Sequence, residues 1–91
     1  MPAPHKEKAL VALKKANGLL QKVLRMAESD EYCIDVMQQN MAVMGLLKSA
    51  HQSLLQGHLE GCFVSGLHSG NAAKKRKMIE EMLAVTKLAN A

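Results

Sequence analysis

Aromatic side chains are almost missing from this sequence, which has no Trp, one Phe and one Tyr in 91 residues. Aromatic and β-branched side chains favour strands, whereas the aliphatic and Met side chains that dominate here suit the faces of helices. We therefore predict an all-α protein. A chain of this length forms a single domain, residues 1–91, with a small core. We expect part of its apolar surface to be covered by self-association, as a homodimer or homotetramer.

Long apolar runs are also missing. No segment reaches the ~18 consecutive apolar residues that span a bilayer, and the start of the chain, residues 1–6, has no apolar signal region. We expect a cytoplasmic protein with no membrane partner. Its two cysteines, without an export signal, are then expected to be reduced thiols and not a disulfide. Neither a nucleophile–base pair nor a phosphate-binding loop is present, so we expect no enzymatic activity.

Positive charge is in modest excess, with 12 Lys and Arg against 8 Asp and Glu and a net charge of +4. Symmetry in an oligomer would repeat this charge, which is compatible with a polyanionic partner such as DNA. Many soluble helical proteins are equally basic, so the charge alone does not establish that partner.

Apolar periodicity and helix-breaking residues predict three helices. The first covers about residues 5–28, with apolar side chains at three- and four-residue steps. These are Leu10, Leu13, Leu20, Leu24 and Ala27. Ser29–Asp30 is expected to break this helix and to supply the N-cap of the next one. A loop is predicted at residues 65–71 and a third helix at 72–88.

The second helix is the longest, at about residues 31–64, and its stripe has heptad-like spacing throughout. The stripe is Cys33, Met37, Asn40, Met44, Leu47, His51, Leu54 and His58. Three glycines interrupt the range, and each lowers helix stability by about 1 kcal/mol relative to Ala. We nevertheless predict one continuous helix.

A thiol and an imidazole, Cys62 and His58, are four residues apart on this helix and therefore share a face. Cys33 precedes them by 29 and 25 residues, which at about 100° per residue leaves offsets of only about 20°. All three side chains thus lie on one stripe. Within one straight helix, however, Cys33 and His58 are separated by about 40 Å.

These residues can combine only if a second copy of the helix runs antiparallel to the first. A two-fold axis near residues 45–48 would bring Cys33 of one chain beside His58 and Cys62 of the other, and symmetry would create two identical sites. Gly45 lies near this crossing, where the absence of a side chain allows close approach.

Two thiolates and one imidazole form a soft set of ligands with low coordination number. Soft sulfur ligands select Cu(I) or Zn(II), and three ligands leave Zn(II) one short of its tetrahedron, so Cu(I) is favoured. The alternative also stays open: Cys33 could be a small buried residue, and His58 with Cys62 an ordinary interface pair.

Two segments at this separation, Glu28–Met37 (ESDEYCIDVM) and Gly57–Phe63 (GHLEGCF), resemble the copper-sensitive operon repressor (CsoR) family. The resemblance covers roughly residues 6–70 well and the third helix loosely. Related sensors of nickel, cobalt or formaldehyde differ at the position of Cys62, which indicates the copper branch. The resemblance implies an antiparallel four-helix-bundle dimer, paired again as a dimer of dimers, with Cu(I) bound by Cys33, His58 and Cys62 across protomers.

The resemblance further implies a repressor whose affinity for operator DNA falls when Cu(I) binds. Tyr32 and Glu81 match positions that link metal binding to helix movement in the family, and Glu80 competes with Glu81 for that place. A carboxylate can orient a metal-bound imidazole through its free ring nitrogen. Both glutamates could equally be solvent-facing charges.

The sequence departs from the family at Ala12 and Ser49, where the family carries basic residues linked to DNA. Lysines elsewhere are therefore expected to contact phosphates, without the bidentate geometry of arginine. The expected DNA-binding residues are Lys14, Lys15, Lys48, Lys74, Lys75, Arg76 and Lys77. These departures leave a second hypothesis open, a cytosolic copper(I) buffer or chaperone on the same scaffold that has lost DNA binding.

Overall fold

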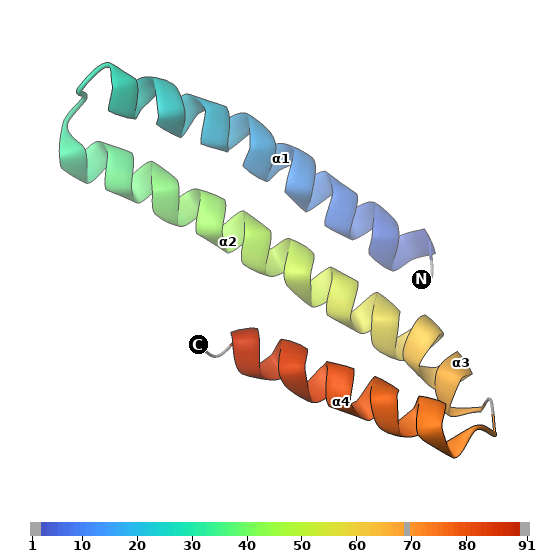
Figure 1. Ribbon diagram of the computed structural model, residues 1–91. Coiled ribbons are helices and arrows are strands. Elements are labelled where there is room, and N and C mark those ends of the chain that lie inside the picture. Colours follow the sequence, from blue (N-terminus) through green and yellow to red (C-terminus); the bar gives the residue numbers. More distant parts are fainter. Residues whose placement is uncertain (1–2, 69, 90–91) are drawn as a thin grey trace.

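The computed structural model describes residues 3–68 and 70–89. Its elements are α1 (Ala3–Glu28), α2 (Cys33–Gly57), the π-helix η1 (His58–Phe63), α3 (Val64–Leu67) and α4 (Ala72–Ala89). No strand occurs in these two ranges, so the all-α prediction is confirmed. Helices α1 and α2 form a long antiparallel hairpin, and α4 folds back along the second half of α2 (Figure 1). No described helix has the length and apolar character needed to cross a membrane.

The α1–α2 hairpin is held by two stripes with alternating three- and four-residue steps, the spacing of an antiparallel heptad seam. On α1 the residues of this seam, all buried or half-buried, are Ala9, Ala12, Ala16, Leu19, Val23 and Met26. On α2 they are Val36, Gln39, Val43, Leu46, Ala50, Ser53 and Gly57. The central cluster packs Val23 and Ala16 against Val43. Small side chains dominate the end of the seam near Gly57, which lets the two helices approach closely there.

The stripe predicted to be the apolar side of the first helix lies next to this seam and is not buried in the hairpin. Leu10, Leu13, Leu20 and Leu24 expose 41, 37, 43 and 53% of their surface. The predicted stripe of the second helix is likewise outside the core. Leu13, Leu20 and Leu47 line one groove, so both stripes lie on the same side of the hairpin.

We call this side the apolar face. Its members are Leu10, Leu13, Leu20, Leu24, Met37, Met44, Leu47 and Leu54. Because α1 and α2 are held together by the buried seam, the apolar face remains available for other contacts.

The turn between α1 and α2 differs from the prediction. Asp30 does not cap the second helix but takes a left-handed conformation, with φ of 53°, at the end of α1. The N–H of Asp30 donates to the carbonyl oxygen of Ala27 at 3.2 Å, and the N–H of Glu31 donates to that of Met26 at 3.1 Å. This is the pattern of a Schellman motif. Helix α2 then begins at Cys33 with Tyr32 as its N-cap, without a side-chain capping bond.

The predicted second helix continues further than expected but changes its geometry. The helical path runs to Leu67, yet residues 58–63 are wound as a π-helix. The predicted loop is therefore shorter than 65–71, and Ser69 lies outside the described residues. Gly70 turns the chain with a φ of 78°, and the side chain of Asn71 caps α4 by accepting the N–H of Lys74 at 3.1 Å.

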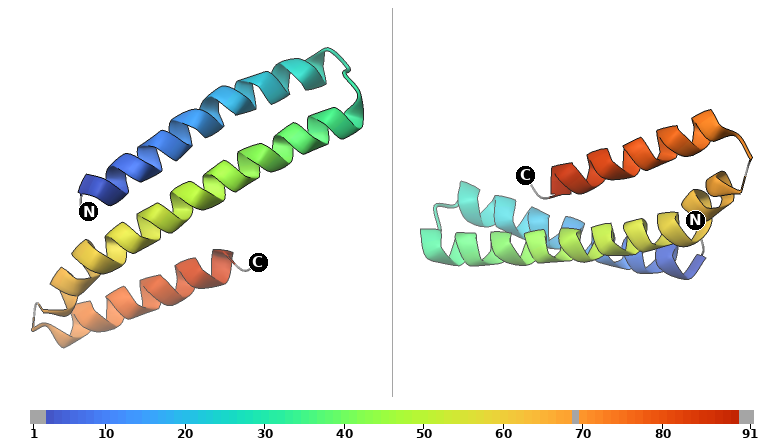
Figure 2. Two further views of the ribbon diagram at one scale, coloured as in Figure 1. Left: turned by 180° about the vertical axis from the view of Figure 1, so that it is seen from behind. Right: turned by 90° about the horizontal axis from the view of Figure 1, so that it is seen from below.

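Helix α4 is attached mainly at its start. A Cβ at Gly66 would overlap the side chain of Met78, so the glycine lets α4 approach α3 closely. None of the side chains at 72–88 is buried, and Leu83 and Leu88 are exposed by 66 and 75%. In the second view of Figure 2, α4 stands off the α1–α2 hairpin. This helix therefore depends less on the core than α1 and α2 do.

Candidate metal centre

The three predicted metal ligands lie at the two ends of α2. Cys33 is the first residue of the helix and a free, exposed thiol. His58 and Cys62 are in η1 beyond the other end, with His58 half-buried and Cys62 exposed. Among residues 3–68 and 70–89, no three His, Cys, Asp or Glu side chains stand close enough to hold a metal ion. The structure thus brings His58 and Cys62 onto one short segment and leaves Cys33 far from both.

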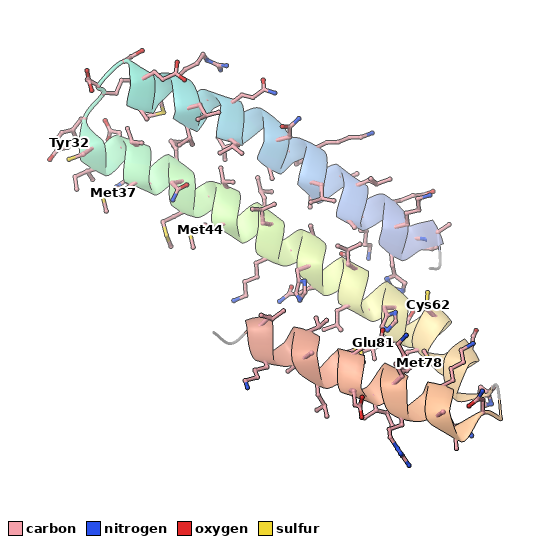
Figure 3. The ribbon with its side chains drawn as sticks, in the orientation of Figure 1. Tyr32, Met37, Met44, Cys62, Met78 and Glu81 are labelled. Atoms are coloured by element: carbon pink, nitrogen blue, oxygen red, sulfur yellow. The ribbon has the colours of Figure 1, made fainter. Side chains whose placement is uncertain are left out.

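The π-helix changes how these two ligands are related. Four residues exceed one turn of an α-helix but fall short of one turn of a π-helix, whose hydrogen bonds close wider rings. The offset predicted for Cys62 assumed an α-helix and therefore does not hold. The ring of His58 lies 6.1 Å from that of Phe63, tilted by 55°. Cys62 projects from the edge of its helix opposite Glu81 in Figure 3.

The imidazole of His58 shares a pocket with a carboxylate from another helix. This pocket lies between α2 and α4, and Glu81 lines it together with His58. Figure 3 places Glu81 on the side of α4 that faces the end of α2. Glu80 is exposed and does not line this pocket. Tyr32, the other residue implied by the resemblance, is 67% exposed beside Cys33.

A pair that the sequence analysis did not identify joins η1 to the start of α1. The Nε2 atom of His5 lies 2.5 Å from Oε2 of Glu60, across 55 residues of sequence. Gln56 donates to the other carboxylate oxygen at 3.2 Å. The hydrogen bonds from His5 and then Gln56 hold the pKa of Glu60 below its usual value. No local sequence signal could have revealed a contact over this separation.

A second side of the hairpin carries positive charge. Lys8, Lys15, Lys22 and Arg25 lie at steps of seven, seven and three residues along α1, directly beside the buried seam. Lys8 and Lys15 line a groove with Ala12 and Ser49. Lys22 and Arg25 line the next groove along the same side. We call these four residues the basic face; it lies across the seam from the apolar face.

The DNA-contact residues expected from the sequence do not form one surface. Of these, Lys15 belongs to the basic face and Lys14 is exposed beside it. Lys48 lines a separate groove between α2 and α4. Lys74, Lys75, Arg76 and Lys77 occupy the start of α4, where Lys75 is half-buried. Lys8, Lys22 and Arg25 of the basic face were not among the residues expected from the sequence, although their heptad-like spacing beside the seam could have revealed this face.

Comparison with known proteins identifies the family of this chain. The chain matches a family described as metal-sensitive transcriptional repressor over residues 5–87. Since the match covers nearly the whole chain, the protein belongs to this family of metal-sensitive transcriptional repressors.

Individual relatives are named as copper sensors. The copper-sensing transcriptional repressor CsoR of Mycobacterium ulcerans (strain Agy99) is 40% identical over 82 residues, covering 90% of this chain and 68% of the relative. CsoR of Mycobacterium tuberculosis (strain H37Rv) is also 40% identical, with 90% and 66% covered. The copper-sensing repressor RicR of the same strain is 34% identical, with 84% and 79% covered. The chain thus spans about two thirds of the length of the two CsoR proteins.

Proposed function

We propose that this protein is a Cu(I)-responsive repressor that binds operator DNA in the cytoplasm and releases it when copper binds at a site shared by two chains. One observation carries the proposal. The exposed free thiol of Cys33 lies at one end of α2, and His58 with the exposed free thiol of Cys62 lies beyond the other end. Between the two ends, α2 carries an exposed apolar stripe. The family and the copper-sensing relatives support the same function.

The apolar face supplies the means of assembly. Water-exposed Leu and Met side chains on α1 and α2 would be buried by a second hairpin packed on the same side, forming a four-helix bundle. If the two α2 helices run antiparallel, Cys33 of each chain approaches η1 of the other. We propose this homodimer as the unit of function, with a dimer of dimers as its further assembly. Each chain contributes one domain, and the assembly has no enzymatic role.

The ligands fit copper(I) by their chemistry. Two thiols and one imidazole give soft ligands in low number, and Cu(I) accepts such an environment. When bound, the copper would link η1 of one chain to the start of α2 of the other. Glu81 lines the pocket of His58, from where its carboxylate can accept the free ring N–H and fix the orientation of the imidazole.

The basic face supplies a surface for DNA. It lies across the seam from the apolar face, so a dimer formed through the apolar face leaves its lysines accessible to phosphates. Four cations spaced along one helix suit the regular charge of a DNA backbone. Lys8 and Lys15 of this face stand in the same groove as Ala12 and Ser49, where the family's basic residues are missing.

DNA binding with and without Cu(I) tests this function. A duplex from the region upstream of the protein's own gene should bind the metal-free protein in a salt-dependent manner and dissociate when one Cu(I) per chain is added. DNA binding that ignores Cu(I) would reject the proposal. Tight Cu(I) binding without salt-dependent DNA affinity would instead favour the copper buffer or chaperone, to which the buried Ala12 in the groove lends some support.

A further inference from the structure

The carboxylate of Glu60 joins η1 to the start of α1. Glu60 lies two residues after His58 and two before Cys62. Side chains two residues apart on a helix do not face each other. The carboxylate therefore does not face either ligand, and His5 and Gln56 occupy both of its oxygens. Any movement of the ligand segment must carry this carboxylate with it.

The other end of the pair lies beside the basic face. His5 is in the first turns of α1 and precedes Lys8 by three residues, so the two are neighbours on the helix surface. The His5 side chain is only 14% exposed, against 52% for Glu60, which means that the imidazole is packed between the two segments. The His5–Glu60 contact thus joins the segment that carries His58 and Cys62 to the turn of α1 that carries Lys8.

The segment η1, which carries His58 and Cys62, is also wound differently from the rest of the helix, as a π-helix. A π-helix is a rare geometry that occurs mostly as single turns near functional sites. Rewinding η1 as an α-helix would turn Glu60 relative to α2 and separate it from His5. Coupling between two sites requires an element of this kind, with two discrete arrangements that both sites bias.

We infer that the His5–Glu60 pair couples the metal segment to the DNA surface, so that copper bound at His58 and Cys62 shifts the first turns of α1. This inference rests on the proposed function and adds the contact through which copper binding would act on the DNA surface. In the metal-free protein the pair holds α1 in the arrangement that presents Lys8. Copper binding fixes η1 against the partner chain, strains the pair and changes the position of the basic face.

The test compares five full-length proteins: wild type, His5→Ala, Glu60→Gln, His5→Gln and the control Glu28→Gln. The ratio of DNA affinity without and with Cu(I) measures the coupling. Allosteric coupling usually amounts to about 5- to 150-fold, and we expect the first two variants to reduce the ratio at least about fivefold. His5→Gln keeps a donor nitrogen and should restore most of the coupling. Glu28→Gln removes the same charge from an exposed site at the far end of α1 and should change nothing.

Hydrogen exchange of the metal-free proteins gives a readout that does not depend on copper. The amides at 60–64 should exchange faster in His5→Ala than in wild type and return toward wild-type protection in His5→Gln. Circular dichroism should show all variants to be folded.

The outcomes separate this inference from the function on which it rests. Wild type that binds no Cu(I), or binds DNA regardless of Cu(I), overturns the proposed function and the inference with it. If Cu(I) lowers the DNA affinity of wild type, and lowers that of His5→Ala and Glu60→Gln by the same factor, the inference alone is overturned. DNA affinity that falls by the same factor without and with Cu(I) overturns it as well, because the pair would then be part of the DNA surface itself. Metal-free DNA affinity that falls toward the copper-bound level of wild type, with Cu(I) stoichiometry retained, is the predicted result.

Discussion

His58 and Glu81 line the same pocket, although the imidazole comes from η1 and the carboxylate from α4. Helix α4 has no buried side chain at residues 72–88, so its position depends on a few contacts near α3 and on whatever joins it to the end of α2. A carboxylate that accepts the free ring N–H of a metal-bound imidazole would be such a contact. Copper binding and the position of α4 are therefore expected to influence each other.

Substitution of this carboxylate should weaken the metal site. Glu81→Gln should reduce Cu(I) affinity or the copper-dependent loss of DNA affinity by about 10- to 100-fold, since partners of metal-bound His usually contribute that much. Competition with a chromophoric Cu(I) chelator measures the affinity. Glu80→Gln is the matched control, because this neighbouring carboxylate does not line the pocket. Equal effects of the two changes would contradict the assignment of Glu81.

The apolar face should be required for self-association. Met44 and Val11 are both 53% exposed, but Met44 belongs to the apolar face whereas Val11 lines the groove of the basic face. Met44→Glu should shift the protein to monomers and abolish tight Cu(I) binding, because each site needs two chains. Val11→Glu should keep the oligomer. Sedimentation equilibrium distinguishes the two, and an unchanged mass for Met44→Glu would mean that the chains associate elsewhere.

The basic face should supply phosphate contacts. Lys15→Ala and Lys22→Ala should each lower the affinity for DNA of any sequence and reduce the slope of log K against log salt by about 0.9 per lost contact. Cu(I) affinity should stay unchanged. Lys87→Ala, at the exposed end of α4, provides a lysine control. The account of the DNA surface is wrong if Lys87→Ala reduces the slope as much as Lys15→Ala does.

Periodicity predicted the helices but not which stripe of α1 would meet α2. The first helix carries two adjacent apolar stripes, one of leucines and one made largely of alanines, and the leucines are the stronger signal. The hairpin uses the other stripe, whose small side chains, such as Ala9, Ala12 and Ala16, are buried between α1 and α2. The sequence could not show which stripe would be buried within the hairpin and which would be left for a partner. Both kinds of burial require the same three- and four-residue spacing of apolar side chains.

The candidate site was predictable where its residues are close in sequence or share a regular helix. The place of His58 and Cys62 on one helical segment falls into this class, and so does the separation of Cys33 from both, but the common stripe predicted for all three does not. The π winding of η1 was not predictable, because its only local indication is the presence of Gly57 and Gly61, which weaken an α-helix without specifying another geometry. Contacts between distant helices, such as His5 with Glu60, required the three-dimensional structure.

Subunit mixing gives the most direct test of a copper site shared between chains. Cys33→Ala and the double variant His58→Ala/Cys62→Ala should each bind no Cu(I) tightly. When the two proteins are unfolded together and refolded, about half of the dimers should contain one chain of each kind, by the statistics of random pairing in a two-fold assembly. Each mixed dimer joins an intact Cys33 to an intact His58 and Cys62, so tight Cu(I) binding should return at about one site for every two dimers. A mixture that binds no more copper than the separate variants would contradict the shared site.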